Sequence, residues 1–370
     1  MKKTQIAAIN LFLITIMFFL LLAGCSMSQK SGSKISNTEN GYAYNSLNDT
    51  EKKAYMQMRS CIENHTDSIA LSVSTESELF HVYKCLLADH GEYFWLAGYK
   101  YEEHTLFGRH VRMTFYPKYT MSKKDAEKTQ SEIDNVVTDI MNYISIYLSD
   151  YEKAKFVFSY LAWNVNYSDS SINNQNIISV FLEKEAVCQG YASATQYLLG
   201  KLGIQSTIIT GTLGDNISHA WNLVKLDDEY YYMDTTLGNY SYSSESSDKY
   251  RYVHYGYMAM TDAMVKHTHS ANVCFPLPTC NSLTDNYYVK EHLYCDHLDY
   301  DKIGQSYRNA WKSKKGTEEK VVTYMFSTSE QFDEAISYFM KNQHVFDYCE
   351  GLDGIRYLAS PELNILTVIL

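Results

Sequence analysis

Cys188, His219 and Asp234 are the residues of this chain whose types, order and local sequence best fit a chemical role. Cys188 precedes apolar residues spaced three and four apart, which predicts a helix with Cys188 in its first turn and its end at Gly203. A thiol there feels the positive end of the helix dipole, which favours the thiolate. A nucleophilic thiolate also needs an acid/base partner and a third group that orients this partner. His219 and Asp234 can supply both.

His219 and Asp234 lie on two segments that together predict a β-hairpin. Residues 218–226 and 230–236 are rich in aromatic and β-branched residues, and a short acidic stretch separates them. With the turn at residues 227–228, two residues face each other across the hairpin when their residue numbers add up to 455. His219 is then diagonal to Asp234 on the same face, about 7 Å away at the backbone. A turn longer or shorter by one residue would place the two on opposite faces.

Five short stretches of this region, in this order, resemble the transglutaminase-like superfamily: Ala186–Ala192, Leu202–Ile204, Ile209–Gly211, His219–Asn222 and Met233–Thr236. The resemblance covers about residues 150–240, roughly a third of the chain. It implies an α+β fold with a papain-like core, in which a helix bearing Cys188 packs on an antiparallel sheet bearing His219 and Asp234. It also implies that Cys188 is the nucleophile, His219 the general base and acid, and Asp234 the residue that orients the histidine.

The resemblance implies a thiol enzyme that acts on peptide or carboxamide bonds through a thioester. The backbone N–H of Cys188 is the expected oxyanion donor, because it points out of a helix start. Further oxyanion or substrate contacts are expected among Trp163, Gln175, Gln189 and Trp221. The chain departs from many bacterial members at Leu237 and Asn239, where those carry Trp and Asp.

Three functions from different classes remain open. Water can open the thioester, which makes the protein a peptidase or amidase, and we favour this because water is abundant and amine acceptors are not. An amine can open it instead, which gives a cross-linker of the protein-glutamine gamma-glutamyltransferase type. The third is a non-catalytic module that binds a cell-wall component or a protein. The presence of all three residues favours an enzyme over a binding module.

The N-terminus predicts export and a lipid anchor. Lys2 and Lys3 precede a largely apolar run over residues 6–22, as in a secretory signal. The ending Leu22-Ala-Gly-Cys25 resembles the bacterial lipobox, which implies cleavage before Cys25 and a diacylglycerol thioether on it. The alternative is an uncleaved membrane anchor, because the run approaches spanning length. In both cases we expect the folded part to lie outside the cytoplasmic membrane.

The composition along the chain divides it into five parts. Residues 25–48 are rich in Ser, Asn and Gly and cannot bury a core, which predicts a flexible tether. The expected parts are a lipoprotein signal peptide (1–24), the tether (25–48), an N-terminal α+β region (49–120), the transglutaminase-like catalytic domain (121–245) and a C-terminal α+β region (246–370).

The two flanking regions share a pattern. Residues 68–116 and 321–370 each read as a strand, a Ser-Thr turn, a capped helix and two more strands. Thr75-x-x-Glu78 and Ser327-x-x-Glu330 predict a capping box at the start of each helix. This suggests a distant internal duplication, and the hypothesis requires the same strand order in both regions.

Charge and composition limit the classes of binding partner that we expect. The formal net charge is −11 and no basic stripe is present, which argues against nucleic acid. We expect a peptide or protein substrate, with cell-wall peptide as one candidate, and the membrane as a partner through the lipid on Cys25. The sequence has no Gly-rich phosphate loop, and we expect no cofactor.

Six cysteines remain besides Cys25 and Cys188: Cys61, Cys85, Cys274, Cys280, Cys295 and Cys349. Outside the cytoplasm they permit three disulfides in fifteen connectivities. A link between Cys61 and Cys85, on two N-terminal helices, is one candidate. The stretch 267–297 is rich in His and Cys, but five residues including prolines separate Cys274 from Cys280. Structural zinc sites usually have tighter pairs, so we expect no metal.

Overall fold

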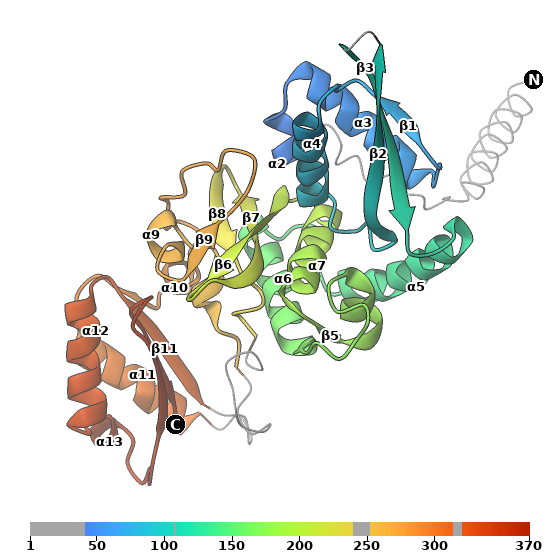
Figure 1. Ribbon diagram of the computed structural model, residues 1–370. Coiled ribbons are helices and arrows are strands. Elements are labelled where there is room, and N and C mark those ends of the chain that lie inside the picture. The colour runs from blue at the N-terminus through green and yellow to red at the C-terminus, as the bar shows by residue number, and fades with distance from the viewer. Residues whose placement is uncertain (1–40, 107–108, 240–251, 314–319) are drawn as a thin grey trace, which may run out of the picture. The chain divides into compact units, whose positions relative to one another are not determined.

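The computed structural model describes residues 41–106, 109–239, 252–313 and 320–370, and the statements below concern those residues. They form four sheets, in which most neighbouring strands are antiparallel, with helices packed against them (Figure 1). This places the protein in the α+β class, as expected. The predicted signal peptide, Cys25 and the tether up to residue 40 lie outside the described residues.

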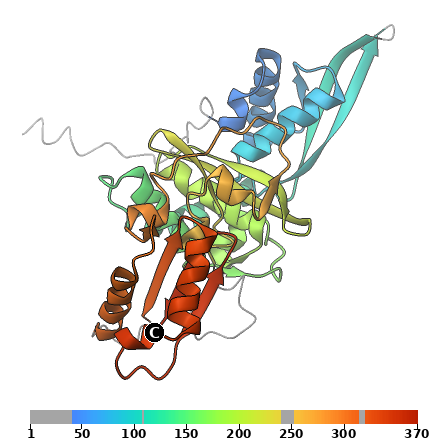
Figure 2. The same ribbon diagram turned by 90° about the vertical axis from the view of Figure 1, so that its left-hand side faces the viewer.

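The N-terminal module is a three-stranded antiparallel sheet with two helices. The strand order is β1-β3-β2, so the first strand pairs with the last. The expected capping box starts the second helix, because Thr75 and Glu78 each accept the other's backbone N–H. In Figure 2 the teal hairpin of the last two strands runs on past the blue helices at its base. The elements are α3 (Asp49–Glu63), β1 (Ile69–Leu71), α4 (Glu76–Asp89), β2 (Leu96–Leu106) and β3 (Arg109–Tyr119).

Residues 41–48, expected to belong to the tether, are folded. The short helix α2 (Tyr42–Asn45) begins where Asp89, at the end of α4, accepts the backbone N–H groups of Ala43 and Tyr44 at 3.0 and 2.8 Å. Ala43 and Leu47 are buried in the core of the N-terminal module. The expected boundary at residue 48 is therefore too late, because a carboxylate distant in sequence caps this turn.

The central unit is an antiparallel sheet of order β8-β7-β6-β9 with helices packed on it. The helix bearing Cys188 lies on this sheet, and Asn222 of β7 donates to the carbonyl oxygen of Ala192 of α7 at 3.0 Å. The elements are α5 (Lys123–Met141), α6 (Asp150–Asn164), β4 (Asn166–Tyr167), a π-helical turn (Ser179–Glu183), β5 (Glu185–Ala186), α7 (Cys188–Lys201), β6 (Ser206–Leu213), β7 (Ile217–Leu226), β8 (Glu229–Met233) and β9 (His269–Ala271).

The central sheet reaches beyond residue 245, where we expected the catalytic domain to end. β9 pairs with the outer edge of β6, with Leu213 opposite His269 and Gly211 opposite Ala271. A side chain at position 211 would clash, because its Cβ would lie 2.0 Å from the carbonyl oxygen of Ser270. Glycine therefore allows this close approach of the two strands. Short elements adjoin β9: a 3-10 turn (Tyr255–Tyr257), α9 (Asp262–Val265) and α10 (Tyr287–Lys290).

The C-terminal module is a four-stranded sheet of order β10-β11-β13-β12. The expected capping box at Ser327 does not form, since Thr328 is the N-cap and accepts the backbone N–H of Gln331. The hydroxyl of Ser327 donates instead to the carbonyl oxygen of Asp296. The elements are β10 (Tyr294–Cys295), α11 (Tyr300–Lys312), β11 (Val321–Phe326), α12 (Ser329–Ala335), a π-helical continuation (Ile336–Lys341), α13 (Val345–Tyr348), β12 (Arg356–Ser360) and β13 (Ile365–Ile369).

The two flanking modules share one three-stranded arrangement. In each, a helix is followed by a strand, a helix and two more strands, the first strand pairs antiparallel with the last, and the last also pairs with the middle one. The C-terminal module adds β10, which pairs parallel with β11, and α13, and neither has a counterpart in the N-terminal module. For the three shared strands, the duplication hypothesis meets its requirement on strand order. The helices α4 and α12 each carry a phenylalanine, and the two differ in burial. Phe332 of α12 is buried, whereas Phe80 of α4 is half exposed.

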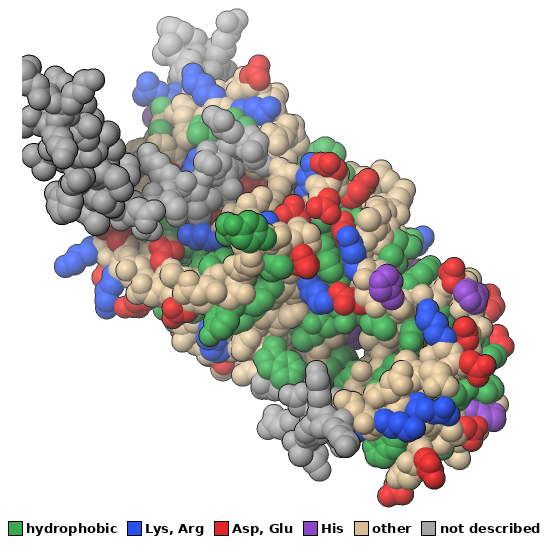
Figure 3. Space-filling model, turned by 180° about the vertical axis from the view of Figure 1, so that it is seen from behind, with side chains coloured by type: hydrophobic (Ala, Val, Ile, Leu, Met, Phe, Trp, Pro, Cys, Tyr) green, Lys and Arg blue, Asp and Glu red, His purple; other side chains and the backbone are tan. Residues whose placement is uncertain are grey.

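Acidic and basic side chains are interspersed on the molecular face in Figure 3, which shows no continuous basic surface over its described residues. This agrees with the absence of a basic stripe in the sequence. Within the described part of the chain, no helix is both long enough and apolar enough to cross a membrane.

Candidate active site

Cys188 is the first residue of α7, as the periodicity predicts. Val187 precedes it in an extended conformation and donates its backbone N–H to the carbonyl oxygen of Asn174 at 2.9 Å. A Cβ at Gly190 would lie 2.7 Å from the same oxygen, so glycine lets the helix start lie against this loop. The first N–H groups of a helix have no acceptor within it. The backbone at Cys188 is therefore suited to bind a negative charge that develops beside the thiol.

The predicted register of the hairpin is confirmed. Asn222 faces Met233 and Leu226 faces Glu229, so the numbers of paired residues sum to 455. Asp227 adopts a positive φ of 48°, which suits the tight turn. Asn222–Met233 is the last pair of the β7–β8 ladder, and Asp234 leaves the sheet by donating its N–H to the carbonyl oxygen of Tyr257. This departure at the strand end frees the Asp234 side chain to reach His219.

Asp234 is fully buried, and both of its carboxylate oxygens are hydrogen-bonded. Oδ1 accepts the backbone N–H groups of Thr236 and Leu237 at 2.9 and 3.1 Å. Oδ2 accepts from Nε2 of His219 at 2.7 Å and from Nε2 of His269 at 3.0 Å. Burial raises the pKa of Asp234, but the two histidines outweigh it and hold the pKa well below its usual range. Asp234 is therefore ionised and fixed in place.

His219 lies between this carboxylate and the Cys188 thiol. Burial lowers the pKa of His219, but Asp234 and Cys188 outweigh that effect and raise the pKa to about 10. Because Cys188 is one of the groups that raise this pKa, its thiol lies near the imidazole, and since Nε2 faces Asp234, Nδ1 is the nitrogen left for the thiol. The structure thus brings the three predicted residues together. Cys188 is the partly exposed one, whereas His219 and Asp234 are buried.

His269 is a fourth member of this cluster that the sequence did not single out as a site residue. It comes from β9, and its Nδ1 contacts the hydroxyl of Thr268 at 2.7 Å. The only sequence signal for it is its place in the His- and Cys-rich stretch 267–297, in which we expected no metal. The seven His and Cys residues of that stretch do not gather, because among the described residues His269 joins Asp234, and Cys274 joins residues of α4.

Trp221 is buried rather than placed to meet substrate. Its ring stacks near His219, with ring centroids 6.0 Å apart, and lies 4.8 Å from that of His269. Its exposed fraction is 1%, so a direct contact with substrate does not fit, whereas its buried indole N–H has no hydrogen-bond partner among the described residues and the expected oxyanion role stays a prediction. Trp221 instead forms the wall that holds both imidazole rings.

Gln175 and Gln189 line one cleft, whereas Trp163 lines another. The cleft with the two glutamines has a volume of about 480 Å³ and lies beside Ser193 and Ile208. Ile208 also belongs to the small apolar cluster against which Cys188 packs. Trp163 borders a separate cavity of about 780 Å³, together with aromatic residues of α6 and the C-terminal module. Of the expected contacts, only the glutamines line this cleft, which adjoins the thiol through Gln189 and Ile208 but is not itself lined by Cys188.

Leu237 and Asn239, where the chain departs from the bacterial pattern, both take part in hydrogen bonds around the site. Leu237 supplies one of the backbone N–H groups bound by Asp234. Asn239 is fully buried, and its side-chain amide donates to the carbonyl oxygen of Val165 and to the hydroxyl of Tyr191. These residues hold the loop after Asp234 against α7.

The cluster His219, Asp234 and His269 also has the composition of a metal site, with all three donor atoms within 4.8 Å of one another. The hydrogen bonds argue against this use. Both oxygens of Asp234 already accept two N–H groups each, so a cation would have to displace the two imidazole protons. The hydrogen bonds of these residues fit an acid–base pair, His219 and Asp234, with His269 as a second histidine on the same carboxylate.

Comparison with protein families finds a match to the same region of the chain. The family model described as the transglutaminase-like superfamily matches residues 139–235, which include all three triad residues. No curated protein matches the chain. The crystal structure of a TGase is 13% identical, with a TM-score of 0.28, over 50% of this chain and 53% of that one.

Two further solved structures are similar at this level. A protein provisionally designated a cysteine protease, from Cytophaga hutchinsonii, is 15% identical with a TM-score of 0.25, over 37% of this chain and 61% of that one. Another so designated as a protease, from Parabacteroides distasonis, is 10% identical with a TM-score of 0.24, over 76% of this chain and 61% of that one. The chain thus spans 53% to 61% of these structures' lengths. On its family match, this protein carries a domain of the transglutaminase-like superfamily at residues 139–235.

Proposed function

We propose that this protein is a thiol hydrolase, a peptidase or amidase, with Cys188 as nucleophile, His219 as general acid and base, and Asp234 as the residue that orients it. The observation that carries the proposal is the buried His219–Asp234 pair beside a partly exposed thiol at a helix start. A buried carboxylate that fixes one imidazole nitrogen leaves the other directed to the nucleophile, as acyl transfer requires.

The proposed reaction proceeds through a thioester. The Cys188 thiolate attacks the substrate carbonyl, and the N–H groups at the start of α7 stabilise the oxyanion. His219, held protonated by Asp234, gives its Nδ1 proton to the departing amine as the C–N bond breaks. The neutral imidazole then takes a proton from water, which attacks the thioester and releases the acid product. That proton returns the His219 imidazolium beside the regenerated thiolate.

The cleft next to the thiol suggests the class of substrate. Its mouth is lined by exposed apolar side chains of α4, Phe80 and Leu87, and its wall by Tyr83, Phe94 and Tyr99. Such a surface suits an aromatic or large aliphatic side chain of a peptide. We therefore propose a peptide or protein substrate with an apolar residue near the bond that is cleaved.

His90 lines the same cleft and offers one polar group that could recognise the substrate. Its Nδ1 contacts the carboxylate of Glu92 at 2.7 Å, which makes Nδ1 a donor. Its Nε2 is buried and has no hydrogen-bond partner among the described residues. A substrate N–H would satisfy this nitrogen where binding moves aside the side chains that cover it.

Hydrolysis fits the cleft better than cross-linking does. A cross-linker must bind a lysine side chain as acceptor, and a carboxylate near the thiol would attract it. The described residues that line the cleft include no Asp or Glu, and they include Lys84, which repels a second cation. Water therefore has the advantage over an amine as the group that opens the thioester.

We further propose that the reaction takes place outside the cytoplasmic membrane, with the protein anchored through lipid on Cys25. The support is the N-terminal sequence, in which a basic start and an apolar run lead to Leu22-Ala-Gly-Cys25. Cell-wall peptide is then a substrate within reach. Metabolic labelling with a fatty-acid probe tests the anchor, and Cys25→Ser is expected to abolish it.

Alkylation of the full chain with iodoacetamide tests the mechanism. Trypsin releases residues 185–201, in which Cys188 is the one cysteine, so its labelling is read by mass spectrometry apart from the others. Wild type is expected to label rapidly at pH 6, because the imidazolium stabilises the thiolate. His219→Ala should slow this labelling by about tenfold or more, whereas Cys280→Ser should leave it unchanged.

Peptide turnover then separates the proposed reaction from its alternatives. A product acid without incorporation of a fluorescent primary amine supports hydrolysis, and incorporation of the amine into the peptide supports cross-linking. If labelling of Cys188 is slow and does not depend on His219, the triad does not activate the thiol. The non-catalytic binding module would then replace the enzyme.

A further inference from the structure

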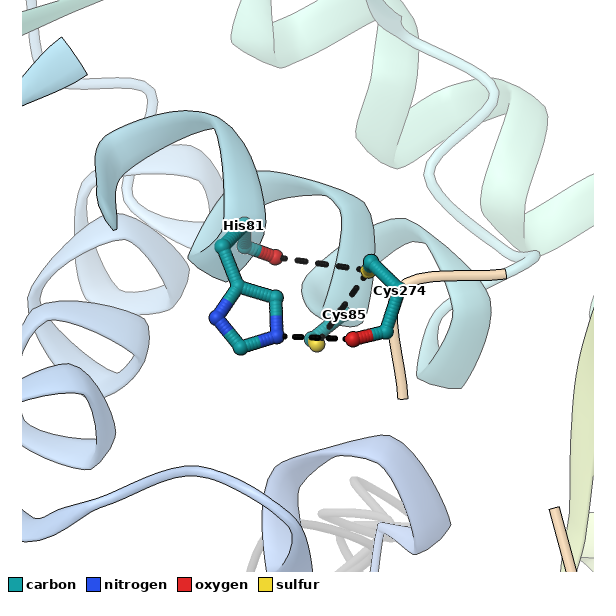
Figure 4. Close-up of side chains that lie close together, drawn as sticks. All are labelled: His81, Cys85 and Cys274. Atoms are coloured by element: carbon teal, nitrogen blue, oxygen red, sulfur yellow. Dashed lines mark hydrogen bonds between the residues drawn. The ribbon is translucent and has the colours of Figure 1, made fainter. Parts of the chain in front are cut away.

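Cys274 lines the cleft and its thiol lies against that of Cys85, although 189 positions separate the two in the sequence. Cys85 is on α4, and Cys274 follows β9 in a segment without regular structure. Their Sγ atoms are 3.7 Å apart, so the two thiols are in contact (Figure 4). Cys61, which we considered as a partner of Cys85, hydrogen-bonds instead with Thr66.

His81 supplies a positive charge beside this pair. It lies one helical turn before Cys85 on α4, on the same face (Figure 4). Its Nδ1 faces the carboxylate of Glu51 at 2.8 Å, and its Nε2 faces the carbonyl oxygen of Cys274 at 3.0 Å. Both partners only accept hydrogen bonds, so both nitrogens must carry a proton. Burial lowers the pKa of His81, but Glu51 and Cys274 outweigh it and raise the pKa.

The three residues have a composition that could bind a metal, with donor atoms within 4.8 Å of one another. The hydrogen bonds oppose that use, because an imidazolium with two acceptors has no free nitrogen for a cation. The same charge favours a thiolate at Cys274. The hydrogen bond with Cys85 is the main cause that lowers the pKa of Cys274, to about 6, against the effect of burial, and His81 and Lys84 contribute.

The two thiols differ in accessibility. Cys274 is exposed, whereas Cys85 is completely buried. The hydrogen bond with Cys274 and burial raise the pKa of Cys85, so it stays protonated. An exposed thiolate in contact with a buried thiol is the arrangement in which one sulfur attacks an external disulfide and the other resolves the product.

We propose that Cys85 and Cys274 form a redox-active pair that closes into a disulfide between α4 and the segment after β9, with an organic disulfide as the oxidant. The Cys274 thiolate attacks the donor disulfide, forms a mixed disulfide and releases one donor thiolate. Cys85 then attacks Sγ of Cys274, a new S–S bond replaces the mixed one, and the second donor thiol leaves with the proton of Cys85. Two protein thiols are oxidised and one donor disulfide is reduced.

The disulfide would fix one wall of the cleft. Tyr83 and Lys84 on α4, and Phe275 beside Cys274, line the cleft on either side of the pair. Closure joins these two segments covalently and restricts their separation. The pair itself does not depend on the proposed hydrolysis, because its formation is measured without any substrate.

Peptide mapping of the full chain after exposure to oxidised glutathione tests the proposal. Trypsin yields residues 85–100 and 267–290, and the second peptide holds both Cys274 and Cys280. The two peptides are expected to be cross-linked in wild type and in the matched control Cys280→Ser. They should not be cross-linked in Cys85→Ser or in Cys274→Ser. If wild type keeps both thiols free, the pair does not form a disulfide.

The order of attack is tested with the single variants. In Cys85→Ser, the mixed disulfide with glutathione is expected to accumulate on Cys274. In Cys274→Ser, Cys85 should remain a free thiol, because nothing exposed passes the oxidant to it. Equal glutathione labelling of Cys85 in the latter variant would overturn the assigned roles.

Two rates and a melting temperature give independent readouts. Under reducing conditions, iodoacetamide should label Cys274 at least about tenfold faster than Cys280 at pH 7, and His81→Gln should slow Cys274 by about tenfold. Oxidation should raise the Tm of wild type by about 5 °C and leave Cys85→Ser unchanged. Protection of both thiols by one equivalent of Zn²⁺ would instead establish a metal site and overturn the imidazolium assignment.

Discussion

His269 donates a hydrogen bond over 3.0 Å to the Oδ2 atom of Asp234, the same atom that accepts from His219. The carboxylate therefore divides its charge between two imidazole rings, one facing the thiol and one from the far edge of the sheet. This ties β9, a three-residue strand, to the chemistry at Cys188. His269 is a positioning residue, since the structure places it on Asp234 and not on the thiol.

Loss of His269 should cost stability and alter His219. His269→Ala leaves a buried carboxylate with one donor fewer, and we expect the free energy of unfolding to fall by about 2–4 kcal/mol in urea. Because Asp234 then acts on His219 alone, the pH at which the His219 ring titrates by NMR should rise. His269→Gln retains a donor and should restore most of the stability. A variant that loses stability without a change in the His219 titration would leave His269 with a packing role only.

The raised pKa of His219 predicts how stability changes at alkaline pH. The folded-state pKa is about 10, above the ordinary value of about 6.5, so the proton on His219 stabilises the folded state. This contribution is complete below pH 6.5 and is lost as the pH rises through 10. The urea midpoint of wild type should therefore fall between pH 7 and 10 more steeply than that of His219→Gln. Parallel pH profiles for the two proteins would contradict the assignment.

His254 predicts the opposite dependence at acidic pH. Burial lowers its pKa to about 4, and its Nδ1 accepts the backbone N–H of Gly256, which requires the neutral ring. The unfolded chain binds a proton near pH 6.5 and the folded one only near pH 4, so stability is lost as the pH falls through this range. The loss amounts to about 3 kcal/mol. His254→Gln should flatten the urea midpoint between pH 6.5 and 4, and an unchanged slope would show that other groups dominate.

Gln196 joins the N-terminal module to the central unit. Its side-chain nitrogen donates to the carbonyl oxygens of Ala88 and Ser206, and its oxygen accepts the N–H of Gly91. Gln196→Ala removes a partner from each of these backbone groups and leaves the Ala88 carbonyl oxygen with the Thr207 hydroxyl alone, so we expect a loss of about 2–4 kcal/mol in thermal or urea unfolding. Gln130→Ala, which removes a half-buried glutamine of α5, is the control and should cost less. Equal losses would argue against a special role for this junction.

The β7–β8 hairpin shows how much of the candidate site could be predicted from the sequence. Alternation of residue types and a two-residue turn were sufficient to predict the register from Asn222–Met233 to the turn. The ladder ends there, so Asp234 reaches His219 by leaving the strand rather than as a diagonal neighbour in the sheet. The helix at Cys188 follows equally from apolar periodicity and a closing glycine. Local patterns therefore predicted the helix and the hairpin, whereas the placing of Cys188 beside His219 and Asp234 followed from the resemblance to the transglutaminase-like superfamily.

The features that escaped prediction depend on contacts between distant segments. β9 is too short to show any periodicity, and it joins the sheet through pairing with β6, so His269 could not be placed. Asp89 caps α2 across 46 positions, which made residues 41–48 resemble a tether. At α12 two hydroxyl residues compete for the N-cap, and Thr328 takes it because Ser327 bonds elsewhere. The local sequence shows neither which strands pair nor which of two hydroxyl residues caps a helix.

The exposed side chains at the mouth of the cleft give a test of the proposed substrate class. Phe80 is 51% exposed, so Phe80→Asp should leave the fold intact while placing a charge where an apolar substrate side chain binds. We expect kcat/KM to fall about tenfold for peptides with an aromatic residue near the cleaved bond, because a buried charge opposes apolar binding. The rate of Cys188 alkylation should not change, since the triad does not contact this residue.

The matched control for this variant lies in the C-terminal module. Tyr357 on β12 is 42% exposed and does not line the cleft, so Tyr357→Asp makes the same change of polarity away from it. It should leave both kcat/KM and Cys188 alkylation at their wild-type values. Equal turnover by Phe80→Asp and wild type would exclude α4 from substrate binding, whereas slower alkylation in Phe80→Asp would show that α4 acts on the thiol itself. A selective loss in kcat/KM assigns the apolar mouth of the cleft to the substrate side chain.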